Sequence, residues 1–151
     1  MSRLSAYGIS LELPAGWEAR AFSHGEPTVH VASFPLPRTD GEFGSRSTAR
    51  MPAGSLFLSL TEYLVQPHEL RDGIFAAHPP RRLRTEELSE QTLLRPLPGQ
   101  RGLQRFFSTE GRAFCLYVVC GRSGGRRLAA ANRMLASLQV AARPAASTAR
   151  T

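Results

Sequence analysis

The most apolar stretch of the chain is Ala113-Phe-Cys-Leu-Tyr-Val-Val-Cys120, and Gly121-Arg-Ser-Gly-Gly125 joins it to a helical pattern. An unbroken apolar run between turn residues is typical of a strand that is covered on both faces. Residues 103–107 precede it across the turn Ser108-Thr-Glu-Gly-Arg112. The pattern predicts a hairpin whose second arm lies in the centre of a sheet.

The helical pattern after the glycine-rich loop has one apolar face. That face is formed by Leu128, Ala131, Leu135 and Leu138. Because these residues recur at the spacing of one side of a helix, the helix is expected to pack across the sheet. Beyond Val140 the chain has too little apolar surface to offset the entropy of ordering it. We therefore predict one domain over residues 1–140 and a disordered tail over residues 141–151.

Alternation of apolar and polar residues predicts four strands nearer the N-terminus. Residues 7–13 and 17–21 are expected to form a hairpin across the turn Pro14-Ala-Gly16, and further strands are expected at 28–34 and 56–63. With the later hairpin, these elements predict an α+β fold. Its main part is a mostly antiparallel β-sheet of about six strands, with the C-terminal helix and one or two other helices packed on it.

Two segments between these strands are less regular. Residues 38–54 show no periodicity and exceed the usual connection of about two to six residues, so they form either a binding loop or a flexible link. Further on, Thr85 is followed by Glu86 and Glu87. A hydroxyl that can cap a helix and carboxylates near its positive end predict the start of one short helix there.

The glycine-rich loop also matches the G-x-S-x-G pattern with which a hydrolase presents a nucleophilic serine, here Ser123. In that fold the acid and the histidine follow the serine, but residues 124–151 contain no Asp, Glu or His. His24 and His30 precede Ser123, and nothing in the sequence places them beside it. We interpret Ser123 as a residue that helps to cap the following helix, and we predict no catalytic residues and no enzyme.

An alternative interpretation makes the same loop a site for a small anion or nucleotide. The loop comprises Gly121, Arg122, Ser123, Gly124, Gly125, Arg126 and Arg127. Its glycines allow backbone N–H groups to approach a phosphate at the positive end of the helix. Arginines in the first helical turn are unfavourable by about 0.3–1 kcal/mol, and a bound anion would relieve this cost. The loop lacks the Lys-Ser/Thr ending of a nucleotide-binding P-loop.

The formal net charge of +7 invites a nucleic-acid interpretation, but the charge is dispersed. All 19 basic residues are arginine, which indicates the codon usage of a GC-rich genome, and they are scattered from Arg3 to Arg150. A nucleic-acid footprint is expected to concentrate on one face, so nucleic acid is not an expected partner. Phe106, Phe107 and Phe114 are accordingly interpreted as core residues and not as a base-stacking surface.

The remaining composition excludes several kinds of site. The four histidines are far apart, and Cys115 and Cys120 lie on opposite faces of one strand, so neither a metal site nor a disulfide is predicted. No cofactor motif is present. We expect two buried thiols in a reducing compartment. The N-terminus has no signal-like apolar run and no segment approaches a membrane span, so a cytoplasmic location is expected.

Two segments carry a resemblance to a known family. Gly8-Ile-Ser-Leu-Glu-Leu-Pro-Ala-Gly-Trp17 and Asn132-Arg-Met-Leu-Ala-Ser-Leu-Gln-Val140 together resemble the PsbP-like superfamily. It includes photosystem accessory proteins, a Ran-GTPase-binding nuclear-transport factor, bacterial lipoproteins and chaperones that load effectors into type VI secretion systems. The resemblance spans nearly the whole domain in order of elements, but residues 38–100 depart from it.

The resemblance implies an α-β sandwich that binds another protein without performing chemistry, because the known members are mostly non-catalytic binders. A protein-interaction or accessory module is therefore the leading expectation. One specific form is a secretion-associated adaptor or chaperone, which would need an exposed apolar groove for client helices.

Overall fold

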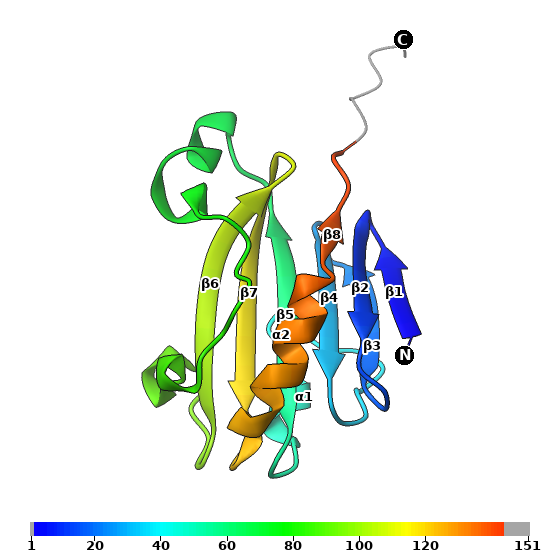
Figure 1. Cartoon of the computed structure of the whole chain (residues 1–151), viewed down its shortest axis with the longest axis vertical. Coiled ribbons are helices and arrows are strands. Elements are labelled where there is room, and N and C mark those ends of the chain that lie inside the picture. The colour runs from blue at the N-terminus through cyan, green and yellow to red at the C-terminus, as the bar shows by residue number, and fades with distance from the viewer. Residues whose placement is uncertain (1, 144–151) are drawn as a thin grey trace.

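A computed structural model describes residues 2–143 as an α+β fold with two antiparallel sheets (Figure 1). The larger sheet has the order β3-β4-β5-β7-β6 and the smaller one β1-β2-β8. The strands are β1 (Ser2–Ala6), β2 (Ile9–Leu13), β3 (Glu18–Ser23), β4 (Pro27–Ala32), β5 (Leu56–Tyr63), β6 (Arg101–Thr109), β7 (Arg112–Cys120) and β8 (Gln139–Val140). The α-helices are α1 (Ser45–Ala49) and α2 (Leu128–Ala136). The 3-10 helices are η1 (Pro67–Leu70), η2 (Gly73–Ala76), η3 (Thr85–Glu87), η4 (Glu90–Thr92) and η5 (Gly124–Arg127).

The predicted α+β class with a C-terminal helix on an antiparallel sheet is confirmed. Strand β7 pairs with β5 on one side and β6 on the other, and each of its residues is buried. The turn that joins β6 to β7 contains only Glu110 and Gly111, both with positive φ. This conformation suits the twist of a two-residue hairpin, so the strands run further than the sequence pattern predicted.

The predicted hairpin between residues 7–13 and 17–21 is wrong. Strand β2 pairs with β1 over all five residues, whereas β3 pairs with β4 in the other sheet. Tyr7 and Gly8 both have positive φ and form the tight turn between β1 and β2. The turn in which the Trp17 amide donates to the Pro14 carbonyl instead carries the chain from one sheet to the other. Within residues 2–143 the strands, expected to number about six, are eight and are divided between two antiparallel sheets.

The two faces of the larger sheet are covered by different parts of the chain. Figure 1 shows α2 lying across one face with the smaller sheet beside it. This layer closes the main core, to which α2 contributes Leu128, Ala131, Met134 and Leu135. The segment after β4 covers the opposite face around a second core. The buried members of this core are Ala32, Phe34, Leu36, Phe57, Leu93, Tyr117 and Val119, and Phe43 and Met51 pack against them.

The short helix predicted at Thr85 is only the single 3-10 turn η3. Leu88 after it is already extended, and Ser89 forms an isolated bridge with Gly102 of β6. Pairing with the edge of the sheet therefore replaces further helical hydrogen bonds. The carboxylate of Glu87 accepts from the Arg84 amide at the start of the turn and pairs with Arg105.

A buried ion pair of the larger sheet also contacts the segments beside the smaller sheet. The Arg112 guanidinium donates twice to Glu62, over 3.0 Å from Nε to Oε2 and 2.8 Å from Nη2 to Oε1. It also donates to the carbonyls of Tyr7 and Ala141, which belong to the turn before β2 and the segment after β8. Arg143 donates to the same carboxylate over 2.6 Å. Because the Glu62 and Arg112 side chains are only 1% and 4% exposed, water cannot replace these bonds.

Cys115 and Cys120 are buried and unpaired, as predicted. Cys120 belongs to the main core, whereas Cys115 points to the other face of the sheet and its Sγ accepts a hydrogen bond from the side-chain amide of Gln104. Burial raises the pKa of both thiols to about 11.

Within residues 2–143, no helix has the length and apolar character needed to cross a membrane. Residues 144–151, which make up most of the predicted tail, lie outside the described part of the chain, and residues 141–143 contact the domain through the bonds above.

Candidate binding groove

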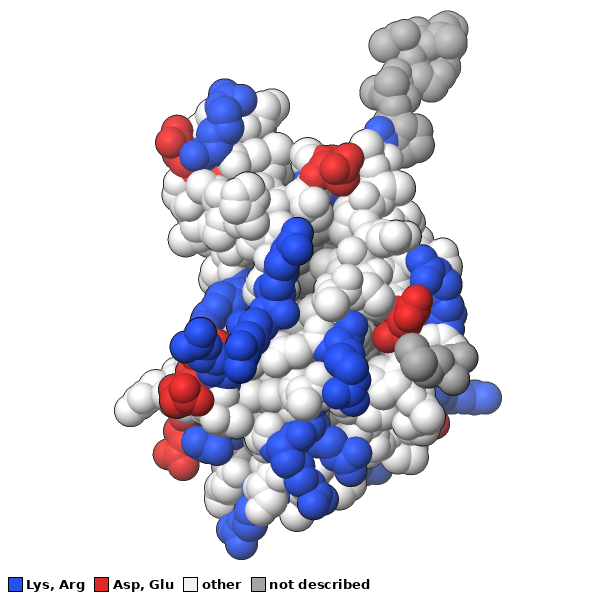
Figure 2. All heavy atoms as spheres, viewed as in Figure 1, with Lys and Arg blue, Asp and Glu red and all other residues white. Residues whose placement is uncertain are grey.

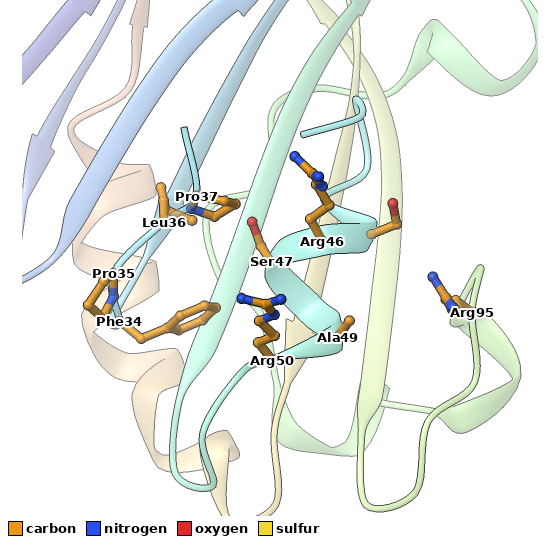
Figure 3. Close-up of a pocket in the computed structure, with 10 residues that line it drawn as sticks. Phe34, Pro35, Leu36, Pro37, Arg46, Ser47, Ala49, Arg50 and Arg95 are labelled. Carbon is orange, nitrogen blue, oxygen red and sulfur yellow. The ribbon is translucent and has the colours of Figure 1, made fainter. Parts of the chain in front are cut away.

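An open groove of about 550 Å³ lies on the face of the larger sheet opposite α2 (Figure 3). We call it the α1 groove. It is lined by Phe34, Pro35, Leu36, Pro37, Ser45, Arg46, Ser47, Ala49, Arg50 and Arg95. The first four residues follow β4, the next four belong to α1, Arg50 directly follows this helix, and Arg95 precedes β6. Its lining therefore joins three segments that are distant in the sequence.

The side of the groove formed by residues 34–37 is held against the edge strand β3. The Leu36 amide donates to the Glu18 carboxylate over 3.0 Å, and the Arg20 guanidinium donates to the carbonyls of Leu36 and Pro37. Phe34 and Leu36 are buried in the second core. Proline cannot donate to a strand, so the chain leaves the sheet here and presents the rings of Pro35 and Pro37 to the groove.

Helix α1 is held in place by Asp40, which lies before it in the chain. The Asp40 carboxylate accepts from the amides of Arg46 and Ser47 over 2.9 and 2.8 Å, and from the Ser47 hydroxyl over 2.6 Å. These amides are among those that a helix leaves without a partner in its first turn. Burial alone would raise the pKa of Asp40, but these hydrogen bonds outweigh it and hold the pKa below its ordinary value.

A buried polar cluster fixes the loop before α1 to the sheet. The Glu42 carbonyl accepts from the ring of His30 over 2.9 Å and from the Ser59 hydroxyl over 2.6 Å. His30 also lies edge-on to the rings of Phe22 and Phe57. Burial lowers the pKa of His30, although the Glu42 carbonyl and the charge of Asp40 act in the opposite direction. The ring is therefore neutral at pH 7 and donates to the loop.

These titratable groups predict that the free energy of unfolding falls as the pH is lowered. The pKa of His30 is lower in the folded chain than in the unfolded chain. As the pH falls, the unfolded chain therefore protonates its histidine first, and the free energy of unfolding decreases below about pH 6.5. Burial would raise the pKa of Glu62, but Arg112 and Arg143 lower it below its ordinary value. Its contribution is full above about pH 4.5 and is lost as the pH falls through the folded pKa.

Urea denaturation at a series of pH values from 8 to 3 checks this expectation. His30→Phe should reduce the slope of stability between about pH 6.5 and 5, because the new ring cannot be protonated. The Glu42 carbonyl keeps its bond from Ser59 in this variant. An unchanged slope in His30→Phe would show that the acid sensitivity in this range comes from other groups.

The charged residues that line the α1 groove are all arginines, although the carboxylates of Asp40 and Glu18 contact the backbone of its walls. Three of its ten lining residues are arginines and none is acidic. Figure 3 shows Arg50 extending from α1 toward Phe34, Arg46 extending from the other end of the helix, and Arg95 on the other side of the helix. Among residues 2–143, the arginines that form ion pairs are Arg3, Arg105, Arg112 and Arg143. Arg46 donates to the Thr39 hydroxyl over 2.8 Å, which leaves its charge uncompensated.

Of the seven residues predicted as an anion site, Arg126 and Arg127 both lie beside Gly54, but the seven do not line one common hollow. Arg122 lies beside Gly99, and Arg127 donates to the Gly54 carbonyl over 2.9 Å. Gly125 and Arg126 instead line a second hollow of about 480 Å³, together with Arg82, Arg84 and Glu86. Figure 2 shows this face, where basic side chains are spread widely with acidic ones between them.

The glycines of this loop serve close packing. A Cβ at Gly124 would overlap the Ser55 carbonyl, and one at Gly121 would lie 2.7 Å from the Pro52 carbonyl. The amides of Gly121 and Gly124 already donate to the carbonyls of Ser55 and Gly121. Two of the amides that were expected to face an anion are thus engaged within the chain. Anion binding by residues 121–127 stays a prediction.

Ser123 precedes η5 with a left-handed φ of 62°, and its side chain makes no capping hydrogen bond. The interpretation of this serine as a helix cap is therefore wrong. Helix α2 begins directly after the 3-10 turn η5, so its first turn is continuous with the helical chain before it. His30, which precedes Ser123 in the sequence, is engaged with the Glu42 carbonyl. Residues 2–143 contain no grouping of three His, Cys, Asp or Glu side chains suited to a metal ion.

The sequence indicated part of the α1 groove. Residues 38–54 were expected to form either a binding loop or a flexible link, and they supply half of the lining through α1 and Arg50. Pattern analysis missed the helix because it is only five residues long and its cap, Asp40, lies outside it. Arg95 had no local signal, since its segment is brought to the sheet by long-range contacts, namely the pairing of residues 89 and 102 and the bond from the Leu94 amide to Tyr117.

Comparison with protein-family models, with curated proteins and with solved structures yielded no match.

Proposed function

We propose that this protein is a non-catalytic interaction module that binds a segment of another protein in the α1 groove. The observation that carries the proposal is the groove itself, which combines a proline-lined wall with uncompensated arginines. Its walls are held by hydrogen bonds that involve Glu18, Arg20, Asp40 and His30. A surface whose shape is set before binding loses less conformational entropy when a partner docks.

The residues that could perform acid-base chemistry support this choice because they already have structural partners. Glu62 is paired with Arg112, Asp40 caps α1, and His30 holds the loop before α1. The groove favours protein binding over anion binding by residues 121–127, in which two loop amides donate to backbone carbonyls. The resemblance to the PsbP-like superfamily supports a finer form of the proposal, a secretion-associated adaptor or chaperone.

Site-specific photocrosslinking in the native host tests the proposed function. A photoreactive amino acid replaces Ala49, which is exposed and lines the α1 groove, or Ala129, which is exposed on α2. We expect one discrete adduct from position 49 that position 129 does not give. The protein identified in the adduct should then bind the purified wild-type chain. Identical adduct patterns at the two positions would contradict a specific partner in this groove.

A further inference from the structure

The α1 groove carries information about the chemistry of its partner. We propose that it recognises an acidic peptide segment, in which Asp or Glu carboxylates alternate with apolar side chains. This inference rests on the proposed function and adds the class of ligand. Its evidence lies in the charges of the groove, the apolar surface between them and the occupied backbone amides of α1.

Two of the three arginines of the groove lie at α1. Arg46 is within the helix and Arg50 is the C-cap residue after it, and neither forms an ion pair within residues 2–143. Figure 3 shows Arg50 extending toward Phe34, whereas Arg46 extends from the other end of α1. Guanidinium groups bind carboxylates through two parallel hydrogen bonds, which makes arginine well suited to this ligand.

The wall of the groove offers apolar contacts between the charges. Pro35 and Pro37 line it, Phe34 and Leu36 form its buried floor, and in Figure 3 the Arg50 guanidinium extends toward the Phe34 ring. Next to Arg95, Leu94 is 57% exposed, while its backbone amide is fixed by the Tyr117 hydroxyl over 2.9 Å. A ligand that complements this surface carries apolar groups as well as negative charge.

The position of Asp40 favours carboxylates over a phosphate group. Phosphates bind where several free backbone amides point to one place, as at the first turn of a helix. Here the amides of Arg46 and Ser47 donate to Asp40 and are therefore not free to bind a phosphate. The three arginines stand on both sides of α1. This spread suits charges distributed along an extended peptide better than charge concentrated on a single group.

The floor of the groove also argues against a nucleic acid. Single-stranded nucleic acids are held by aromatic rings on which bases stack. Phe34 is the only aromatic side chain among the ten lining residues and is 7% exposed, so its ring cannot serve as such a surface. The acidic peptide is therefore the occupant that the charges and the apolar wall together favour.

Selection from a random library of displayed 12-residue peptides tests this inference. The purified chain serves as bait beside two charge-matched variants. One is Arg46→Gln/Arg50→Gln/Arg95→Gln in the groove, and the other is Arg81→Gln/Arg82→Gln/Arg133→Gln, at exposed positions that do not line it. We expect the wild-type chain and the second variant to enrich peptides that combine Asp or Glu with apolar residues. The groove variant should lose this enrichment.

The most enriched peptide then gives the affinities by fluorescence anisotropy. The groove variant should bind it about tenfold more weakly, because exposed ion pairs each contribute modestly. Replacement of its Asp and Glu by Asn and Gln should have a similar effect, and the loss should shrink in high salt. Matched thermal unfolding of the three chains confirms that the substitutions leave the fold intact, and Arg50→Gln alone provides a milder variant.

The possible results separate this inference from the proposed function. Enrichment of neutral or basic peptides, or equal binding by the two triple variants, would overturn the acidic specificity while a position-49 adduct would still support protein binding. If no peptide is enriched and position 49 gives no specific adduct, both the ligand class and the proposed function fail.

Discussion

Arg112→Met is expected to lower the free energy of unfolding by about 3–5 kcal/mol, the cost of leaving one member of a buried ion pair without its partner. Glu62 would retain only Arg143, whose side chain is 50% exposed. The carbonyls of Tyr7 and Ala141 would lose their donors as well. Both carbonyls lie in the smaller sheet or beside it, so the substitution should loosen the contact between the two sheets. Urea denaturation at pH 7 measures the change.

Two further variants show whether burial causes this effect. Arg3→Met removes the Arg3–Glu12 pair, whose side chains are 47% and 48% exposed, and should cost less than about 1 kcal/mol. Glu62→Leu/Arg112→Met replaces both buried charges with apolar groups and should recover part of the stability lost in Arg112→Met. If Arg112→Met costs no more than Arg3→Met, the buried pair does not stabilise the fold in the way we describe.

The central strand and the last helix could be predicted because their patterns are local. Residues 113–120 are apolar without interruption, and one face of residues 128–138 is apolar at helical spacing. The pairing of the strands with one another was harder to predict. The alternating pattern of residues 9–13 allows this strand to pair either with the strand before it or with the strand after it. It pairs with the strand before it, to which the tight turn at Tyr7 and Gly8 joins it.

The polar side chains that form key contacts in this fold have partners that are distant in the sequence. The alternation of apolar and polar residues does not reveal such partners. Glu62 shares a face of β5 with the apolar residues Leu58 and Leu60, which marks it as unusual, but its partner Arg112 lies fifty residues away. The α1 groove depends likewise on a carboxylate six residues before Arg46 and on the bridge between residues 89 and 102. A short sequence pattern predicts which face of each strand is buried, but it does not predict which distant residues contact each other.

Gly44→Ala is expected to lower the free energy of unfolding by about 2–4 kcal/mol, through backbone strain and overpacking in the second core. Gly44 has φ 71° immediately before α1, a conformation that side chains with a Cβ rarely adopt. The added methyl group would also overlap the ring of Phe57, which is fully buried. Because α1 begins at the next residue, relief of this overlap must move the helix away from the sheet and change the α1 groove.

Denaturation of neighbouring and compensating variants separates these two causes. Gly41→Ala is the matched control, since a Cβ there meets no atom within 4 Å and the backbone does not require positive φ, so stability should change by less than about 0.5 kcal/mol. Phe57→Leu makes room for the new methyl group, so the cost of Gly44→Ala should be smaller in that background. The part that persists there measures backbone strain. Equal stability of Gly44→Ala and Gly41→Ala would mean that close packing of Gly44 against the Phe57 ring does not position α1.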